Sequence, residues 1–323
     1  MYSQGATILR PDLRGVVEEA FNASNQFIGG RALPPLPVPT KAGQYPVVTK
    51  ATGSLLRNQA QRRGPGTNYA RTTRSFTNDS YTCLEYGSEA IVPDDEAKDI
   101  GRFFDLERSE TRWKYREIQL AHEIRAASVI NDPATFSLTT SATAYTTANM
   151  ASFDAGLDID TAKQAIAARG ENPEGLTAIM SLTIFNLLRA STRVQNRVRG
   201  RSSTDTFLPL DAAALAEALG LKEVLVGNAS YDTSKVGAST SSMSAIWSNT
   251  YIWLGQCVQS AGMRDFFAGG TAYTLFWQED ADIFQVESYR EEDIRSNVIR
   301  ARQYTAEKVV NANTAQLLVT QYS

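Results

Sequence analysis

No acidic residue occurs between Glu19 and Asp79, and this long segment limits the folds that are open to the chain. The segment carries eight basic residues, which are Arg31, Lys41, Lys50, Arg57, Arg62, Arg63, Arg71 and Arg74. The whole chain has 32 Lys and Arg against 35 Asp and Glu, so the remainder holds 24 basic and 35 acidic residues. Such a cationic segment beside an anionic body predicts either binding to nucleic acid or docking onto the acidic body of another copy. The remaining alternative is a solvated loop.

The first part of this region is predicted to be an extended arm. A short helix is expected over residues 11–22, with Val16, Val17 and Phe21 on its apolar side. The run ALPPLPVPTKAG follows, and its four closely spaced prolines impose an extended path. We interpret the run as an arm lying on a surface, with a proline-rich peptide ligand as the alternative.

A long two-stranded excursion is predicted next. The segments YPVVTKA and YTCLEYGSEAIV are typical of strands, and the stretch between them is polar and rich in Arg, with Gly-Pro-Gly at residues 64–66. A hairpin of this length cannot bury its own faces. We therefore expect it to lie on another surface.

The strongest helix is predicted over residues 94–130. Apolar residues recur at three- and four-residue spacing over its length, namely Phe103, Leu106, Trp113, Leu120, Ile124 and Ala127. Glu110 and Glu117 interrupt this row, which favours one helix packed on a sheet over a coiled coil. Asn131, Asp132 and Pro133 should end the helix.

The rest of the chain alternates between the two periodicities. Helices are predicted over 159–168, 181–191 and 211–220, and strands over 176–180, 222–227 and 244–255. From residue 271 onward, four strand-like segments suggest a meander that ends the chain, namely 271–278, 282–290, 296–304 and 315–322.

Catalytic, cofactor and metal sites are not predicted. The chain has one histidine, His122, which we expect on a helix surface, although a dyad with Cys83 or a serine stays open. Cys83 and Cys257 match no metal or redox spacing and are expected to be free thiols. Acidic clusters at 94–99, 279–282 and 291–293 lack the spacing of a calcium loop and are expected to be solvated. We expect no cofactor and no enzyme.

Membrane insertion and secretion are also not predicted. The chain starts without a basic region followed by an apolar one. Its longest uncharged stretches, 137–153 and 236–263, are rich in Ser, Thr, Asn, Gln and Gly. Their polar side chains would lack hydrogen-bond partners in a bilayer.

Three segments resemble a known family when they are taken in order. They are DIDTAKQAIAARGENPEGLTAIMSLTIFNLLRAS (158–191), LAEALGLKEVLVGNASYDTS (215–234) and AIWSNTYIWLG (245–255). Together with the order of the predicted parts, they are similar to the major capsid proteins of tailed bacteriophages, whose fold is named for phage Hong Kong 97.

The resemblance implies an α+β fold with a set order of parts. An N-terminal arm would span residues 1–42 and an extended β-hairpin loop 43–90. A peripheral domain with a long spine helix would span 91–149 and regain strands from 271–323. A mixed α/β axial domain would span 150–270.

The resemblance also implies a function. The chain would assemble with itself into hexamers and pentamers of an icosahedral head that encloses double-stranded DNA, in the virion, after assembly in the cytoplasm of a host bacterium. Portal protein and a separate scaffold or decoration protein would be its partners. The expected inter-subunit residues are Lys50, Arg57, Arg62, Arg63, Arg71 and Arg74.

A second basic run could contact other axial domains or face DNA, and consists of Arg193, Arg197, Arg199 and Arg201. An exposed loop is the alternative for this run. The alternatives for the whole chain are an encapsulin-like compartment shell, which would enclose protein cargo, and an Arg-rich nucleic-acid-binding protein.

Overall fold

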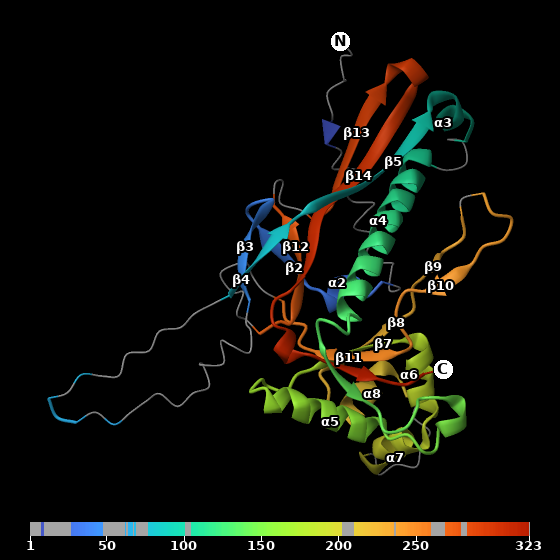
Figure 1. Cartoon of the computed structure of the whole chain (residues 1–323). Coiled ribbons are helices and arrows are strands. Elements are labelled where there is room, and N and C mark those ends of the chain that lie inside the picture. Colours follow the sequence, from blue (N-terminus) through green and yellow to red (C-terminus); the bar gives the residue numbers. More distant parts are fainter. Residues whose placement is uncertain are drawn as a thin grey trace.

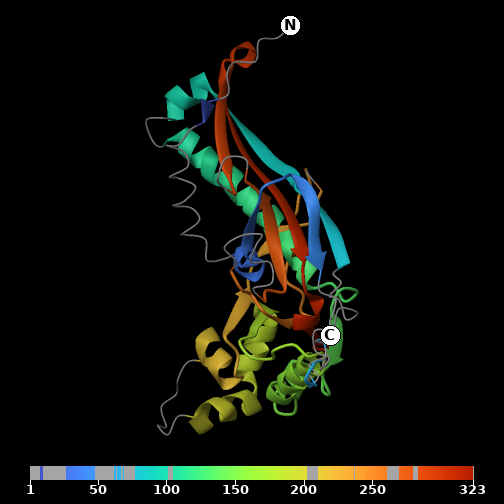
Figure 2. The ribbon, with the colours of Figure 1, turned by 90° about the vertical axis from the view of Figure 1, so that its left-hand side faces the viewer.

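Two stacked domains make up an elongated molecule (Figures 1 and 2). The computed structural model describes residues 8–9, 27–47, 62, 64–66, 68, 77–100, 105–201, 210–235, 237–259, 269–278 and 283–322. We name the domains upper and lower after their positions in Figure 1. The helix predicted over 11–22 lies outside the described residues.

The upper domain is built on a six-stranded sheet. Its order is β1-β13-β14-β12-β2, and β5 also pairs with β14. All pairs are antiparallel except β2 with β12. The strands are β1 (Ile8–Leu9), β2 (Pro35–Val38), β5 (Leu84–Pro93), β12 (Ala272–Trp277), β13 (Gln285–Glu291) and β14 (Ser296–Val309).

The predicted C-terminal meander is wrong. The strands over 271–304 exist, but β12 and β13 both pair with the long strand β14, and the last strand β15 (Gln316–Val319) belongs to the sheet of the lower domain. The short 3-10 helix Ala312–Thr314 separates β14 from β15. The chain thus ends by tying the two domains together.

The proline run is extended, as its composition predicts, and it forms the edge strand β2. Leu36 and Val38 are fully buried, whereas Pro35 is exposed. Proline donates no backbone hydrogen bond, so it suits β2, whose outer side pairs with no other strand of the described residues. Just before β2, the short helix α2 (Gly29–Ala32) is also packed into the body of its own chain.

The predicted excursion agrees with the structure only at its base, because most of the segment YTCLEYGSEAIV forms β5 and pairs with β14. β3 (Ala42–Val47) runs antiparallel to β4 (Thr77–Thr82), with Ala42 opposite Thr82 and Val47 opposite Thr77. The two strands leave the upper domain at its side (Figure 1). Tyr45 and Tyr81 are buried at their base, in a cluster with residues of β2 and β12.

The single long helix is corrected to two helices. α3 spans Asp94–Ile100 and α4 spans Leu106–Ile130, while residues 101–104, including Phe103, lie outside the described residues. α4 begins at Leu106 because Asp105 is extended and its carboxylate accepts a hydrogen bond from the Arg108 backbone N–H at 3.2 Å. α4 ends at Ile130, as predicted.

The buried face of α4 also differs from the prediction. Thr111, Tyr115 and Ile118 are at most 3% exposed, whereas Trp113, the centre of the predicted stripe, is 69% exposed. The helix therefore packs on β5 and β14 through a largely different row. Polar and aromatic residues can fill that row because they are hydrogen-bonded within α4 itself, Thr111 to the Glu107 carbonyl and Tyr115 to the Gln119 side chain.

The lower domain holds a mixed five-stranded sheet of order β6-β15-β11-β7-β8. The helices pack around this sheet on a continuous apolar core. Besides β15, the strands of this sheet are β6 (Ser137–Thr140), β7 (Thr177–Ser181), β8 (Glu223–Gly227) and β11 (Tyr251–Gly255). The helices are α5 (Ala155–Ala168), α6 (Leu182–Ala190), α7 (Thr192–Arg201) and α8 (Ala212–Ala218), with a 3-10 turn at Thr147–Asn149.

Capping residues set the helix starts in this domain. Asp154, Ser181 and Asp211 each accept a hydrogen bond from the backbone N–H three residues later. The Asp154 cap starts α5 at Ala155, four residues before the predicted start. The predictions for β7, α6, α8 and β8 are confirmed to within a few residues.

The strand predicted over 244–255 is two strands. β10 (Met243–Ala245) pairs with β9 (Ser230–Asp232) in a separate hairpin, and β11 begins after a turn at Trp247–Thr250. Trp247 itself is 2% exposed and packs between the domains. A buried aromatic residue in a turn is not distinguishable from a strand residue by local pattern.

The domains meet around one buried carboxylate, that of Glu123 in α4. Its Oε1 accepts hydrogen bonds from the Ile28 N–H at 3.0 Å and from the Trp247 indole N–H at 2.7 Å. Its Oε2 accepts from the Gly29 N–H at 2.6 Å. A Cβ at Gly29 would lie 2.6 Å from that oxygen, so only glycine allows this approach.

Among the helices of the described residues, none is long and apolar enough to cross a membrane.

We expect the substitution Glu123→Gln to lower the free energy of unfolding by about 1–3 kcal/mol, because the amide turns an N–H toward one of three buried donors. Chemical denaturation of the full chain measures the change. Glu110→Gln, on the same helix, is the control and should change stability by less than about 0.5 kcal/mol. Equal effects of the two substitutions would contradict the role of Glu123.

Candidate interaction surfaces

The base of the β3–β4 excursion is fixed to the upper domain. The Tyr45 hydroxyl donates to the Asp79 carboxylate at 2.8 Å, and this bond lowers the pKa of Asp79. The Tyr81 hydroxyl lies 3.0 Å from the Thr40 hydroxyl. The hairpin therefore leaves the domain in a defined direction. Its own two strands cannot bury their faces, so another surface must cover them.

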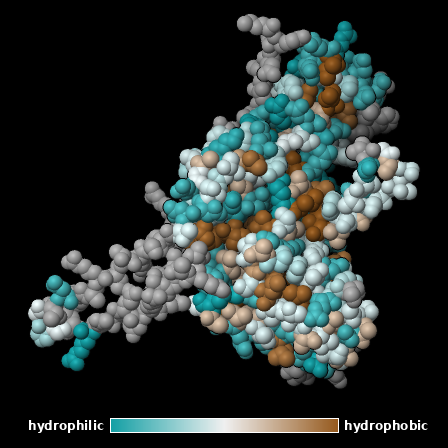
Figure 3. All heavy atoms as spheres, viewed as in Figure 1, coloured by the Kyte–Doolittle hydropathy of each residue, from teal (hydrophilic) through white to brown (hydrophobic). Residues whose placement is uncertain are grey.

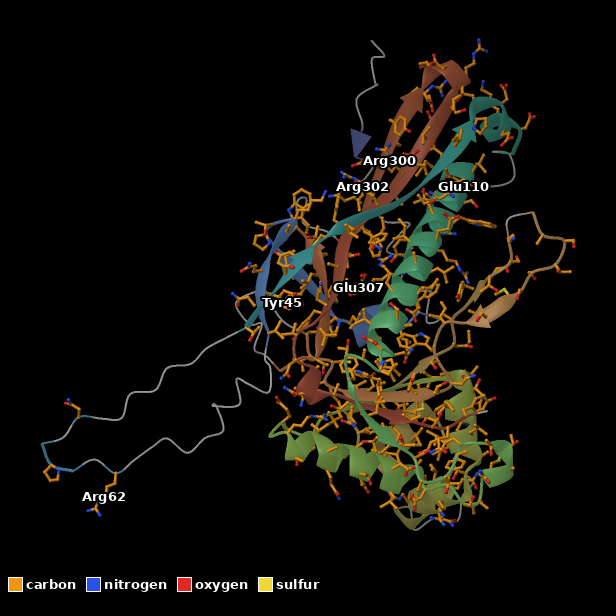
Figure 4. All side chains as sticks on the ribbon, in the orientation of Figure 1. Tyr45, Arg62, Glu110, Arg300, Arg302 and Glu307 are labelled. Carbon is orange, nitrogen blue, oxygen red and sulfur yellow. The ribbon has the colours of Figure 1, made fainter. Side chains whose placement is uncertain are left out.

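The basic residues predicted along the excursion are only partly described. Arg62 is exposed and lies well away from both domains, beyond the β3–β4 strands (Figure 4). The other five lie outside the described residues, namely Lys50, Arg57, Arg63, Arg71 and Arg74.

An ion-pair network crosses β5, β14 and β13 on the sheet face opposite α4. Glu287 accepts from two nitrogens of Arg302, at 3.0 and 2.6 Å, and its side chain is only 8% exposed. Arg300 pairs with Glu89, and Arg302 also lies 3.9 Å from Glu85. Within this network three carboxylates thus face two guanidinium groups.

Two of the acidic clusters come together at the far end of the upper domain. α3 follows β5 directly, and the β13–β14 turn, which includes the 3-10 helix Glu292–Ile294, lies beside it. Arg290 joins them by donating to both carboxylate oxygens of Asp94, at 2.5 and 2.7 Å, which lowers the pKa of Asp94. The acidic residues gathered here are Asp94, Asp95, Glu96, Asp99, Glu291, Glu292 and Asp293. The cluster at 279–282 lies outside the described residues.

The second basic run forms helix α7 in the lower domain. Arg193 pairs with Asp154 at 3.3 Å, and Arg197 lies 3.7 Å from Asp160. Both acids belong to or cap α5, so these two arginines have partners within the chain. The side chains of Arg199 and Arg201 lie outside the described residues. The loop alternative is wrong for 192–201, because that segment is helical.

The β9–β10 hairpin projects from the side of the molecule opposite to β3–β4 (Figure 1). Its residues from Ser230 to Ala245 are exposed or half-buried wherever they are described. The surface of this hairpin is nearly neutral in hydropathy, whereas the upper domain shows teal areas with brown patches among them (Figure 3). The sequence pattern did not reveal this projection, because its two strands are only three residues long.

His122 is not on a free helix surface, which corrects the prediction. Its Nε2 lies 3.0 Å from the Thr274 hydroxyl and its side chain is 13% exposed. Cys83 packs with Tyr273 and Leu275, whose side chains point to the other face of β12. His122 and Cys83 are therefore on opposite faces of the sheet and form no dyad.

Burial controls the protonation of both groups. It lowers the pKa of His122 to about 4 and raises the pKa of the Cys83 thiol to about 11. Cys83 and Cys257 are free thiols, as predicted. Within the described part of the chain, no group of three or more His, Cys, Asp or Glu side chains could hold a metal ion.

We expect the free energy of unfolding to fall by about 2 kcal/mol between pH 7 and pH 5 through His122 alone. The folded pKa is depressed, so the unfolded chain takes up the proton first and stability is lost as the pH falls below 6.5. Chemical denaturation of the unmodified chain and of the His122→Gln variant at several pH values isolates the contribution of His122 to the free energy of unfolding. Parallel pH profiles of the two proteins would contradict it.

No protein-family model matches the sequence, and no curated protein matches it significantly. Solved structures match over nearly the whole chain. A phage-related protein from Bordetella bronchiseptica RB50 has a TM-score of 0.69 at 19% identity and covers 98% of both chains. The capsid of the cyanophage P-SCSP1u has a TM-score of 0.56 at 11% identity, covering 100% of this chain and 90% of that one.

A virus-like particle from Pyrococcus furiosus also matches, with a TM-score of 0.55 at 9% identity, covering 95% of this chain and 98% of that one. At these identities the likeness establishes the fold. The chain has the mixed α+β fold of Hong Kong 97-type capsid proteins, as the sequence resemblance implied.

Proposed function

We propose that this chain is the major capsid protein of a tailed bacteriophage, assembling into the hexamers and pentamers of an icosahedral head around double-stranded DNA. The observation that carries the proposal is the full-length match to solved phage capsid structures. The protein would act as a building block of the virion and catalyse no reaction. Its buried, unreactive His122 and Cys83 support this part of the proposal.

The two domains would have separate places in the shell. The upper domain would be the peripheral domain, with α4 as its spine, and the lower domain the axial domain around each ring centre. A ring of identical copies needs one surface to meet a different surface on the next copy. The projections β3–β4 and β9–β10, on opposite sides of the molecule, are suited to such head-to-tail contacts (Figure 1).

The basic excursion would bind the acidic upper domain of a neighbouring copy. Its arginines lie in a segment without a single carboxylate, whereas carboxylates exceed cations in the ion-pair network of β5, β13 and β14 and at the far end of the upper domain. Opposite charges on two surfaces steer association and fix its register. Many weak contacts of this kind can hold a closed shell.

The roles of the second basic run follow from its pairing. Arg193 and Arg197 would stiffen the contact between α7 and α5, since each is already paired with an acid there. Arg199 and Arg201, at the end of α7, would contact neighbouring axial domains or packaged DNA.

The remaining parts of the proposal concern context. Assembly would take place in the cytoplasm of a host bacterium, with portal protein and a separate scaffold or decoration protein as partners and no membrane. An encapsulin-like shell around protein cargo is the second candidate. The match to the Pyrococcus furiosus particle supports it.

We expect the purified or co-expressed full chain to form closed icosahedral particles, which negative-stain images would reveal. Nucleic acid inside the particles favours the phage head, and a single co-purified protein favours the compartment. If the chain stays a compact monomer under every assembly condition, both the phage-head and the encapsulin-like proposals are wrong.

Replacing Arg57, Arg62, Arg63, Arg71 and Arg74 together by Glu should raise the concentration needed for assembly by about tenfold or more, since it turns attraction into repulsion. The same five positions changed to Lys form the matched control and should still assemble. Light scattering at increasing concentration measures the threshold. If the Glu variant assembles normally but no longer binds DNA with a steep salt dependence, the arginines serve nucleic-acid binding.

A further inference from the structure

A cavity of about 600 Å³ lies at the base of the β3–β4 excursion, and we call it the junction cavity. Three parts of the chain line it, which are the excursion base, the end of α4 with the turn after it, and the end of β14 with the 3-10 helix that follows. Tyr45 and Glu307, which both line it, are labelled in Figure 4. Its volume lies in the range of roughly 300–1,000 Å³ that is usual for ligand pockets.

Two carboxylates of the junction cavity come from different elements and are held in place. Asp79 of β4 accepts from the Tyr45 hydroxyl at 2.8 Å. Asp132, after α4, accepts from the Thr135 hydroxyl and from the Ala134 N–H, the latter at 3.0 Å. These bonds lower the pKa of both carboxyls, so both are ionised at neutral pH. Each carboxylate can still accept further hydrogen bonds.

The rest of the wall is partly apolar. A third carboxylate, that of Glu307, is already paired with Arg125 at 3.1 Å. Lys308 is the one basic residue among the described residues that line the cavity. The apolar part of the wall includes Val47, Val129 and Val309. The junction cavity therefore suits a cation that is accompanied by an apolar side chain.

The tip of the β9–β10 hairpin presents these two groups. Lys235 is exposed and is the only basic residue of the hairpin, and Met243 beside the tip is 62% exposed. The carboxylate of Asp232 accepts from the Ser234 N–H at 2.9 Å and from the Ser242 N–H at 3.0 Å, which ties the two sides of the tip together. A tip ordered in this way loses less entropy when it binds.

The hairpin and the junction cavity lie on opposite sides of the molecule. The cavity is on the side from which the excursion leaves, and β9 and β10 are at the level of β4 along the long axis (Figure 1). In a ring with the lower domains at its centre, rotation keeps each feature at the same distance from the centre. One side of each copy then meets the other side of the next copy.

We propose that the tip of the β9–β10 hairpin of one copy inserts into the junction cavity of the next copy. Lys235 would lie against Asp79 and Asp132, and Met243 against the valines of the wall. This inference rests on the proposed self-assembly and names two surfaces that meet in it.

Disulfide trapping between two full-length copies tests the contact. A size-tagged Lys235→Cys copy mixed with an untagged Asp132→Cys copy should form a disulfide under mild oxidation. We expect this bond to form about tenfold faster than the bond of a Lys222→Cys copy with the Asp132→Cys copy. Lys222 is exposed in the lower domain, outside the hairpin and the junction cavity, so Lys222→Cys is the matched control. Non-reducing gels and peptide mass spectrometry identify the bond, and each variant alone accounts for Cys83 and Cys257.

The outcomes separate this contact from the proposed function. Equal rates for Lys235→Cys and Lys222→Cys would overturn the contact, and so would particles in which the 235–132 disulfide does not form. Disulfide-linked copies that never form particles would uphold the contact and overturn the proposed shell. The absence of both particles and the disulfide would overturn both.

Exchanging the charges covers the case in which a cysteine variant does not fold. Lys235→Glu should raise the concentration needed for assembly about fivefold, whereas Lys235→Arg should leave it nearly unchanged. Adding Asp132→Lys to Lys235→Glu should bring the threshold back toward that of the unmodified chain, which a merely structural effect of either substitution would not do. Light scattering measures the threshold. If the double variant assembles no better than Lys235→Glu alone, the contact is wrong.

Discussion

The carboxylate of Glu123 is the contact on which the arrangement of the two domains depends. It accepts three hydrogen bonds, from backbone groups that enter α2 and from the indole of Trp247 in the lower domain. Burial raises the pKa of Glu123, and the three bonds oppose this shift. A buried carboxylate is tolerated only when it is bonded in this way. Helix α4, the chain entering α2 and the lower domain are therefore joined at this carboxylate.

Polar contacts also orient α4 on its sheet. Arg125 pairs with Glu307 at 3.1 Å and donates to Thr305, while His122 meets Thr274. Hydrogen bonds are directional, so they specify one position of the helix along the strands more sharply than apolar packing alone.

The distribution of charge and the shape of the molecule point to the same conclusion. Two hairpins project from opposite sides, and an isolated two-stranded hairpin gains little stability from its own contacts. The stretch between β3 and β4, residues 48–76, contains no acidic residue and is complementary in charge to the acidic upper domain. The excursion and this domain are different parts of one elongated molecule (Figures 1 and 4). Assembly of many copies would give each of these exposed features a partner.

The sequence by itself determined the elements with strong local signals. Helical and strand periodicity predicted α6, α8, β7 and β8, the prolines predicted the extended path of β2, and the resemblance predicted the fold. Tertiary contacts decided the rest. The buried face of α4 depends on partners far away in the chain, because Glu123 is buried only where Ile28, Gly29 and Trp247 donate to it, and His122 meets Thr274 of the sheet. The pairing of β15 and the burial of Trp247 depend on residues far away in the chain, so the spacing of apolar residues in the local sequence cannot predict them.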